Sequence, residues 1–220
     1  MLTLSESIPH MPMHQEDPES VRLILASTSR YRRELLERLS IPFCCIPPEV
    51  EESRLPGESP EDMAWRLATE KSRAVSARYP RHVVVGSDQV ADWQGQALGK
   101  PGTRQDACAQ LAKVSGQTVV FHTAVSISIG AQQWTASTAT RCCFRKLSQE
   151  AIKRYVDIDN PIDTAGSAKA ESLGIALMES MQSEDPTAII GLPLIALTNL
   201  LRQAGLDPLQ DHHLTSSPTR

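Results

Sequence analysis

Residues 117–144 of the chain read QTVVFHTAVSISIGAQQWTASTATRCCF. Polar and apolar side chains alternate over residues 117–129 and again over residues 134–144, which is the period of a half-buried β-strand. Gly130-Ala131 lies between the two runs and offers a tight turn. The segment therefore predicts two long antiparallel strands joined as a hairpin, on which the remaining elements must pack.

Outside the hairpin, short aliphatic runs and helical stretches follow one another along the chain. Residues 21–25 and 82–85 are predicted strands, and the second has the continuous apolar pattern of a strand buried on both faces. Ser59 followed by Pro60 marks a helix that should extend to about residue 78. Further helices are predicted over residues 30–39, 103–113 and 148–156, where Ser148 is the expected cap. A last helix is predicted between Gly191-Leu192-Pro193 and Gly205. This order predicts an α/β fold with a mixed, partly antiparallel sheet flanked by helices.

The composition excludes several classes of protein. The 220 residues are 40% hydrophobic and 22% charged, with 22 basic against 26 acidic side chains and a formal net charge of -4. An acidic chain with 4% aromatic residues lacks the basic surface and the stacking rings that a nucleic-acid polymer requires. No apolar run approaches the ~20 residues that span a bilayer, and the start lacks the pattern of a secretory signal. We expect neither a nucleic-acid polymer nor a membrane as partner.

The length suits one compact domain. Residues 1–20 and 209–220 lack periodicity and are predicted to be a flexible leader and a flexible tail around a domain over residues 21–208. The five cysteines include two adjacent pairs, Cys44-Cys45 and Cys142-Cys143, and none has Cys-x-x-Cys spacing. We interpret them as reduced thiols that act as small apolar residues, which indicates a cytoplasmic protein.

The segment LASTSRYRR, residues 25–33, ends a predicted strand and begins a predicted helix. Backbone N–H groups point outward at such a junction and bind anions. Three arginines in the first helical turn oppose the helix dipole, so an anionic partner is expected. A phosphate chain fits, because guanidinium groups, hydroxyl donors and free amides would all converge on it. The alternative is an exposed basic turn paired with Glu34 and Glu37.

Two further places bring charge to predicted buried positions. Asp88 is expected just beyond the carboxyl end of the strand at 82–85, where open α/β sheets place their ligands; the alternative is an Asp that caps a turn formed by Gly86-Ser87-Asp88. Lys71 falls on the apolar stripe of the helix that begins at Pro60, so it either reaches out at the edge or faces an anion in a cleft. Lys100 lies beside a rigid turn in Gly99-Lys100-Pro101.

Acidic residues form the counterpart of these cations. Glu49, Glu51 and Glu52 follow two prolines and could hold a divalent metal together with Asp88. The alternative is a solvated acidic loop. A metal, several cations and a carboxylate at a strand end together fit phosphoryl chemistry, in which positioning and charge neutralisation supply most of the catalysis.

Seven short motifs occur in an order that resembles the Maf-like nucleoside triphosphate pyrophosphatases over about residues 21–208. They are Leu-Ala-Ser-Thr-Ser-x-x-Arg-Arg-Glu-Leu-Leu (25–36), Pro-Glu-Val-Glu-Glu (48–52), Glu-Lys (70–71), Gly-Ser-Asp-Gln-Val (86–90), Gly-Lys-Pro (99–101), Ala-Gly-Ser (165–167) and Gly-Leu-Pro-Leu (191–194). The resemblance implies a Maf/inosine-triphosphatase-like fold with a deep nucleotide cleft, often in a homodimer. It also implies hydrolysis of a nucleotide between its α and β phosphates, with a divalent cation, Mg²⁺ or Mn²⁺.

The resemblance assigns expected roles position by position. Asp88 matches the proton acceptor, and Glu52 matches the acidic position that would help Asp88 hold the metal. The positions that bind the phosphates are matched by Ser27, Arg32, Arg33, Lys71 and Lys100. The positions that tune base specificity are matched by Tyr31, Gln89 and Glu171.

Within the family, Ser-Asp-Gln at residues 87–89 is similar to the 7-methyl-GTP branch. The methylated ring is a cation, so an aromatic face at Tyr31 and a carboxylate at Glu171 would favour it. The alternatives are that Tyr31 packs on its helix and that Glu171 pairs with Lys169. Ser172 departs from the glycine expected after the acid. A dTTP/UTP pyrophosphatase of the same family, or a nucleotide-binding regulator of septum formation and cell division, are the rival functions.

Overall fold

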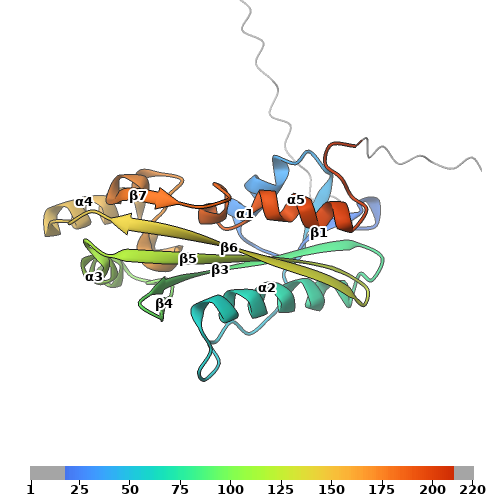
Figure 1. The fold of residues 1–220 in the computed structure, drawn as a ribbon, viewed down its shortest axis with the longest axis horizontal. Helices are drawn as coiled ribbons and strands as arrows, with labels where there is room; N and C mark the ends of the chain where they lie inside the picture. Colours follow the sequence, from blue (N-terminus) through green and yellow to red (C-terminus); the bar gives the residue numbers. More distant parts are fainter. Residues whose placement is uncertain (1–17, 211–220) are drawn as a thin grey trace, which may run out of the picture.

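The computed structural model of the chain describes residues 18–210, which contain one mixed sheet of seven strands (Figure 1). In space the sheet runs β2-β1-β3-β5-β6-β7, and β4 pairs with the carboxyl end of β3. Strand β1 is parallel to β2 and β3, whereas the other pairings are antiparallel. The strands are β1 Leu23–Leu25, β2 Phe43–Cys45, β3 Val83–Trp93, β4 Gln96–Leu98, β5 Thr118–Ile129, β6 Gln132–Phe144 and β7 Met178–Gln182. The predicted mixed α/β fold is confirmed.

Helices flank this sheet. The α-helices are α1 Arg30–Glu37, α2 Pro60–Ser76, α3 Arg104–Val114, α4 Gln149–Asp159 and α5 Leu194–Gln203, and the short 3-10 helices are Pro18–Ser20, Pro161–Asp163, Ala165–Ser167, Leu173–Leu177 and Ala188–Ile190. Side-chain oxygens of Ser59 and Ser148 accept backbone N–H groups at the starts of α2 and α4, which is the predicted capping. Among these helices, none is long and apolar enough to cross a membrane.

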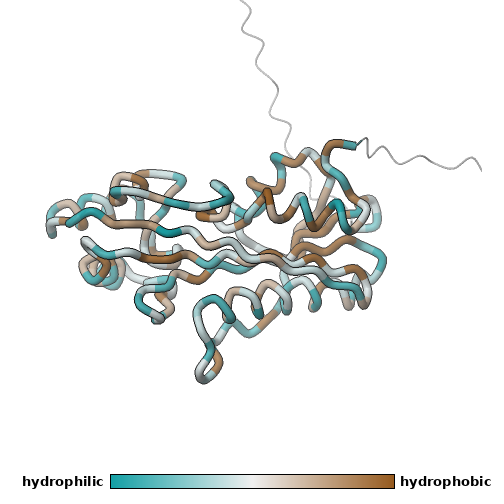
Figure 2. Tube along the Cα trace, in the orientation of Figure 1, coloured by the Kyte–Doolittle hydropathy of each residue, from teal (hydrophilic) through white to brown (hydrophobic). Residues whose placement is uncertain are grey.

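The helices divide the molecule into two ends joined by the long strands β3, β5 and β6. Helix α2 covers one face of the sheet, α1 and α5 lie over the opposite face at one end, and α3 and α4 lie at the other end (Figure 1). Each end has its own apolar core, one with residues of α1 and α5 and one with residues of α3 and α4. Figure 2 shows apolar residues along β1 and α5 at the first end and along α3 at the second. A space between the two ends can therefore hold a ligand without disturbing either core.

The predicted hairpin is confirmed. Strands β5 and β6 pair from Ile129↔Gln132 to Thr118↔Cys143, and Gly130-Ala131 forms the turn. Strands β2, β4 and β7 were not predicted, because runs of three to five residues are too short to show a period and, unlike the aliphatic run of β1, they contain cysteine, glutamine or glutamate. The predicted leader and tail fall largely outside the described residues.

The prediction that the strand at 82–85 ends before Asp88 was wrong. Strand β3 continues to Trp93, and Asp88 lies inside it, paired with Ala124 of β5. The polar residues are tolerated there because β5 supplies ladder partners and Ser87 Oγ donates to the carbonyls of Ala124 and Gly191, at 2.8 and 3.0 Å. Asp88 therefore does not cap a turn; its side chain is fixed by a central strand.

Gly86 allows helix α2 to lie directly on β3. A methyl group at this position would overlap the carbonyl oxygen of Ala68 and would lie 2.5 Å from the amide nitrogen of Ser72. Both atoms belong to the α2 backbone, so neither can move aside as a flexible side chain would. The Gly-Ser-Asp motif thus needs its glycine for close helix packing rather than for a turn.

We expect the substitution Gly86→Ala to destabilise the protein by about 3 kcal/mol, the upper part of the range for overpacking a core. The apparent Tm in thermal unfolding followed by circular dichroism should fall by roughly 6–12 °C for a chain of this length. Gly99→Ala is the matched control, because a methyl group there meets no atom within 4 Å. Equal Tm values for the two variants would contradict this account of Gly86.

Candidate active site

A cavity of about 840 Å³ lies between the two ends of the molecule, within the range of ligand sites. The start of α1, the acidic loop after β2, helix α2, the middle of β3 and the segments around residues 100, 165 and 190 all contribute to its wall. The predicted site residues that line it are Ser27, Tyr31, Arg32, Glu52, Lys71, Asp88, Gln89, Lys100 and Glu171. The fold therefore gathers residues that are far apart in the sequence.

The first wall is the loop that leads into α1. Ser27 is buried, and its Oγ accepts the N–H of Ser29 at 3.1 Å. Arg32 donates through Nε to the carbonyl of Gly191 at 2.9 Å, so its stem is held while the end of the guanidinium stays available. A helix start with no acid in its first turn and with a held arginine favours an anion in this part of the cleft.

Arg33 is not part of this wall. Its side chain is exposed and forms an ion pair with Glu37, with Nε 3.1 Å from the carboxylate oxygen. Arg33 therefore takes the alternative left open by the sequence, an exposed basic residue paired along its own helix. Arg30 lines the cleft instead, with its guanidinium carbon 4.6 Å from the centre of the Tyr31 ring.

Lys71 lies at the centre of the cleft's charged end. It faces inward from α2, is only 4% exposed, and its Nζ is 2.6 Å from Asp88 Oδ1. The same ammonium forms an ion pair with Glu52. Burial alone would raise the pKa of Glu52, but the charges of Lys71, Lys100 and Arg32 bring it below its usual value. The expectation that Lys71 faces an anion is met by two carboxylates of the protein itself.

Glu52 and Asp88 are the candidate metal ligands. They converge on one ammonium group, so their oxygens already surround a position where a cation is stable. In residues 18–210 no group of three or more His, Cys, Asp or Glu side chains is arranged to hold a metal ion. Mg²⁺ in nucleotide sites commonly takes one or two carboxylates and completes its coordination with water and phosphate oxygens. The donor set fits a cation shared with a phosphorylated ligand.

Gln89 presents one defined polar atom to the cleft. Its Nε2 donates toward Thr123 Oγ1 at 2.9 Å and toward the carbonyls of Ala188 and Ile189 at 2.8 and 3.1 Å. Carbonyl oxygens only accept, so the amide cannot be turned round. Among the described residues no hydrogen bond reaches Gln89 Oε1, which leaves an acceptor for a ligand.

Glu171 lies at the rim of the same cleft. Exclusion of water around the carboxyl raises the pKa of Glu171, and the charges of Lys169 and Arg30 only partly offset this effect. Lys169 does not pair with Glu171, because its Nζ is 3.0 Å from Asp163 Oδ1. Ser172 has a φ of -137°, so the chain does not need the positive φ of a glycine there.

Gly191 is a site residue whose contribution sequence reasoning missed. Its motif marked the opening of the last helix and contributed to the family resemblance, but Gly191 itself was given no role in the site; its carbonyl accepts from both Arg32 Nε and Ser87 Oγ. The φ of +121° is accessible to glycine and strained for other residues. A glycine directly before Leu-Pro was the signal that could have indicated an unusual backbone at this point.

Comparison with known proteins gives one family model and curated relatives that match most of the chain. The protein-family model described as "Maf-like protein" matches residues 22–204 of this chain. A 7-methyl-GTP pyrophosphatase of Bordetella pertussis is 56% identical over 191 residues, covering 87% of this chain and 96% of the relative. A 7-methyl-GTP pyrophosphatase of Xanthomonas axonopodis pv. citri is 56% identical over 184 residues, covering 84% and 97%. Among solved structures, the Staphylococcus aureus Ham1 protein matches with a TM-score of 0.42 and 13% identity over 56% of this chain and 72% of that chain.

Proposed function

The chain belongs to the Maf-like family, and from this membership and the geometry of the cleft we propose that it is a nucleoside triphosphate pyrophosphatase acting on 7-methyl-GTP. The observation that carries the proposal is the cluster of Asp88, Lys71 and Glu52 in the same cavity as Gln89 and Glu171. The cations and carboxylates of the first set suit a phosphate chain, and Gln89 and Glu171 suit a base with hydrogen-bond donors.

The reaction is hydrolysis of the bridge between the α and β phosphates. Water attacks one of the two phosphorus atoms of that bridge, the bridging P–O bond breaks, and the monophosphate and pyrophosphate leave. Asp88 accepts the proton of the attacking water. Because Asp88 is held on a central strand and paired with Lys71, little reorganisation is required during the reaction.

The cations of the cleft bind the triphosphate in this proposal. Arg32 and Lys100 offset its charge, and the Ser27 hydroxyl and the amides at the start of α1 donate to its oxygens. The Lys71 ammonium pairs with its two carboxylates and also offsets the charge of the phosphates. Glu52 and Asp88 would hold a Mg²⁺ or Mn²⁺ ion together with the substrate, and the ion would offset the negative charge that develops on the phosphates.

Base selection follows from the hydrogen-bond acceptors of Gln89 and Glu171. Guanine has an amino group that donates hydrogen bonds, and methylation at N7 gives the ring a positive charge. Gln89 Oε1 and the Glu171 carboxylate both accept hydrogen bonds, and the Tyr31 ring attracts a cation. A neutral pyrimidine gains less from this set, which disfavours the dTTP/UTP alternative. A regulator that only binds nucleotides would not need Asp88 beside the phosphates.

The remaining expectations rest on family resemblance and composition. We place the enzyme in the cytoplasm, and no disulfide joins its five cysteines, all of which lie in the described residues. We also infer a homodimer, as the resemblance implies, and a small nucleotide rather than a nucleic-acid polymer as the partner.

Pyrophosphate release from a panel of nucleoside triphosphates with Mg²⁺ tests the proposal. We expect 7-methyl-GTP to give the highest kcat/KM, at least about tenfold above GTP and UTP, the ratio that ~1.4 kcal/mol of selective binding provides. Glu171→Gln keeps the shape of the side chain and removes its charge, so it should lower the preference for 7-methyl-GTP over GTP. Release from UTP alone would overturn the substrate assignment, and release from no nucleotide would overturn the enzymatic function.

A further inference from the structure

Hydrogen bonds attach the segment that carries Glu171 to helix α4, both before and after Glu171 in the sequence. On one side, the Lys169 N–H donates to Tyr155 Oη at 3.0 Å, and the Lys169 ammonium donates to the carbonyls of Asp159 and Asn160, both at 3.2 Å. A lysine that satisfies the last carbonyls of a helix is a favourable C-terminal cap. This side of the segment is therefore fixed by α4.

On the other side the fastening group is the carboxylate of Asp159. Its Oδ2 accepts the hydroxyl of Ser172 at 2.8 Å and the N–H of Gly174 at 3.1 Å. Gly174 also lies against the backbone of Lys169, where a methyl group would come 2.6 Å from the Lys169 nitrogen. Residues 169–174 thus form a compact turn, and Asp159 holds the part of it that contains Ser172 and Gly174.

The position of Asp159 is unfavourable for the helix itself. It is the last residue of α4, where a negative charge opposes the helix dipole. An acid at this place is explained by what it holds rather than by helix stability. Glu171 lies between the two fastened points and is the residue of the turn that, with Ala168, reaches the cleft.

We propose that Asp159 is a positioning residue for base recognition, because its bonds to Ser172 and Gly174 fix the turn that presents the Glu171 carboxylate to the base. This inference rests on the proposed function and adds a residue that does not itself line the cavity. Ser172 stands where a glycine was expected, and its hydroxyl donates a hydrogen bond to Asp159 that a glycine could not make.

The test compares Asp159→Ala, Ser172→Ala and Ser172→Gly with the control Asp157→Asn. Asp157 is exposed on the same turn of helix and pairs with Arg104 at 3.4 Å, away from the segment 169–174. For Asp159→Ala we expect KM for 7-methyl-GTP to rise about tenfold with kcat changed less than about twofold, and the preference over GTP to fall about fivefold. The Ser172 variants should show about a third of this change, and the control none.

A double-mutant cycle with Glu171→Ala separates positioning from general damage. If Asp159 acts through Glu171, then Asp159→Ala has no further effect on the preference in the Glu171→Ala background. Equal losses for 7-methyl-GTP and GTP, or independent effects of the two substitutions, would overturn the inference. Circular dichroism confirms that each variant is folded.

Binding keeps this test separate from the test of the proposed function. The Kd values of 7-methyl-GTP and GTP are measured by calorimetry without a divalent cation, so that turnover is not required. If the wild-type protein binds 7-methyl-GTP but releases no pyrophosphate, the proposed function fails, and the cycle in Kd still decides the role of Asp159. If the wild-type protein shows no preference in Kd, the positioning role fails as well.

Discussion

The substitution Asp88→Asn is expected to lower kcat for pyrophosphate release by about a thousandfold, within the range attributed to a general base. Asparagine has the same shape but cannot accept the proton of the attacking water. It also removes one of the two carboxylates that would hold the divalent cation. Binding should survive, because the held Arg32, Lys100 and the start of α1 are unchanged. Calorimetry should give a Kd for 7-methyl-GTP within about threefold of wild type.

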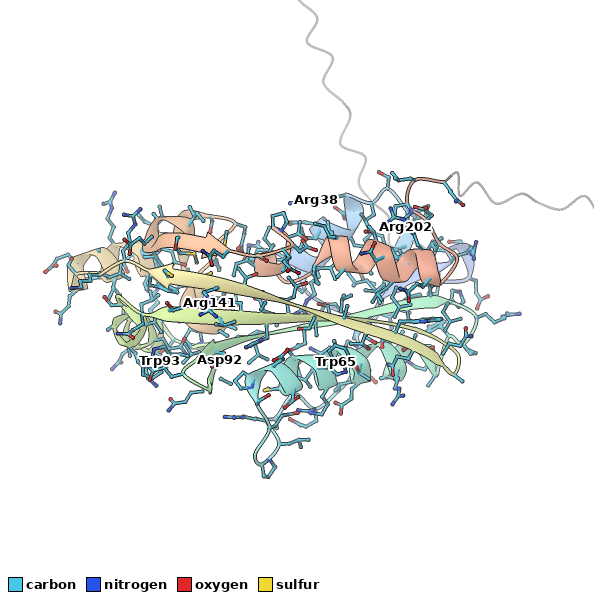
Figure 3. The ribbon with its side chains drawn as sticks, viewed as in Figure 1. Arg38, Trp65, Asp92, Trp93, Arg141 and Arg202 are labelled. Atoms are coloured by element: carbon cyan, nitrogen blue, oxygen red, sulfur yellow. The ribbon has the colours of Figure 1, made fainter. Side chains whose placement is uncertain are left out.

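Asp92→Asn is the matched control for this experiment. Asp92 is on the same strand, four residues further along, near its end beside Trp93 (Figure 3). Its carboxylate accepts the N–H of Gly95 at 2.7 Å and lies 3.3 Å from His122 Nε2, outside the cavity. We expect kcat within about twofold of wild type for this variant. Wild-type turnover by Asp88→Asn would show that Asp88 does not accept the proton.

Local sequence patterns predicted the parts of the fold that are determined locally. The alternation in residues 117–144 gave both long strands and their turn, because the side-chain period follows directly from strand geometry. The caps at Ser59 and Ser148 were predicted since a capping oxygen binds an N–H only three residues away. Neither prediction depended on what packs against these segments.

Features that depend on distant neighbours could not be predicted in this way. Gly86 looked like a turn residue, but what determines its conformation is the backbone of α2 pressed against it and the ladder with β5. Likewise, the inward position of Lys71 was visible as a helical stripe, whereas its pairing with both Glu52 and Asp88 was not. Arg33 is the opposite case. Its position in the family motif suggested a phosphate-binding role, but its side chain pairs with Glu37 and does not line the cleft.

The cluster around Lys71 has an asymmetry that decides its behaviour. Lys71 is almost fully buried, and the Asp88 side chain is 11% exposed, whereas the Glu52 side chain is 54% exposed. A buried carboxylate that loses its cation has no water to replace it, while a half-exposed one is resolvated. Removing the ammonium should therefore lower the stability of the fold mainly through the uncompensated charge of Asp88. It should also weaken binding of the phosphates, because the substrate loses one cation.

Lys71→Met should accordingly destabilise the protein by about 3 kcal/mol at neutral pH, the lower end for breaking one side of a buried ion pair. Methionine keeps the apolar part of the lysine side chain, so the lost stability measures the effect of removing the positive charge. Without the ammonium, Asp88 and Glu52 repel each other, and Lys71 no longer offsets the burial that raises the pKa of Glu52. The deficit against wild type should thus be small near pH 4 and should grow as the pH rises to 7, measured by urea unfolding.

The double variant Lys71→Met/Asp88→Asn tests this assignment, because it removes the uncompensated charge together with its partner. It should recover most of the lost stability but none of the lost turnover, which we expect to fall at least a hundredfold in Lys71→Met itself. Mg²⁺ or Mn²⁺ without nucleotide should also raise the Tm of Lys71→Met more than that of wild type, since a divalent ion can take the position between the two carboxylates. A single variant as stable as wild type at pH 7, or one that divalent ions leave unchanged, would show that Lys71 does not hold these carboxylates together.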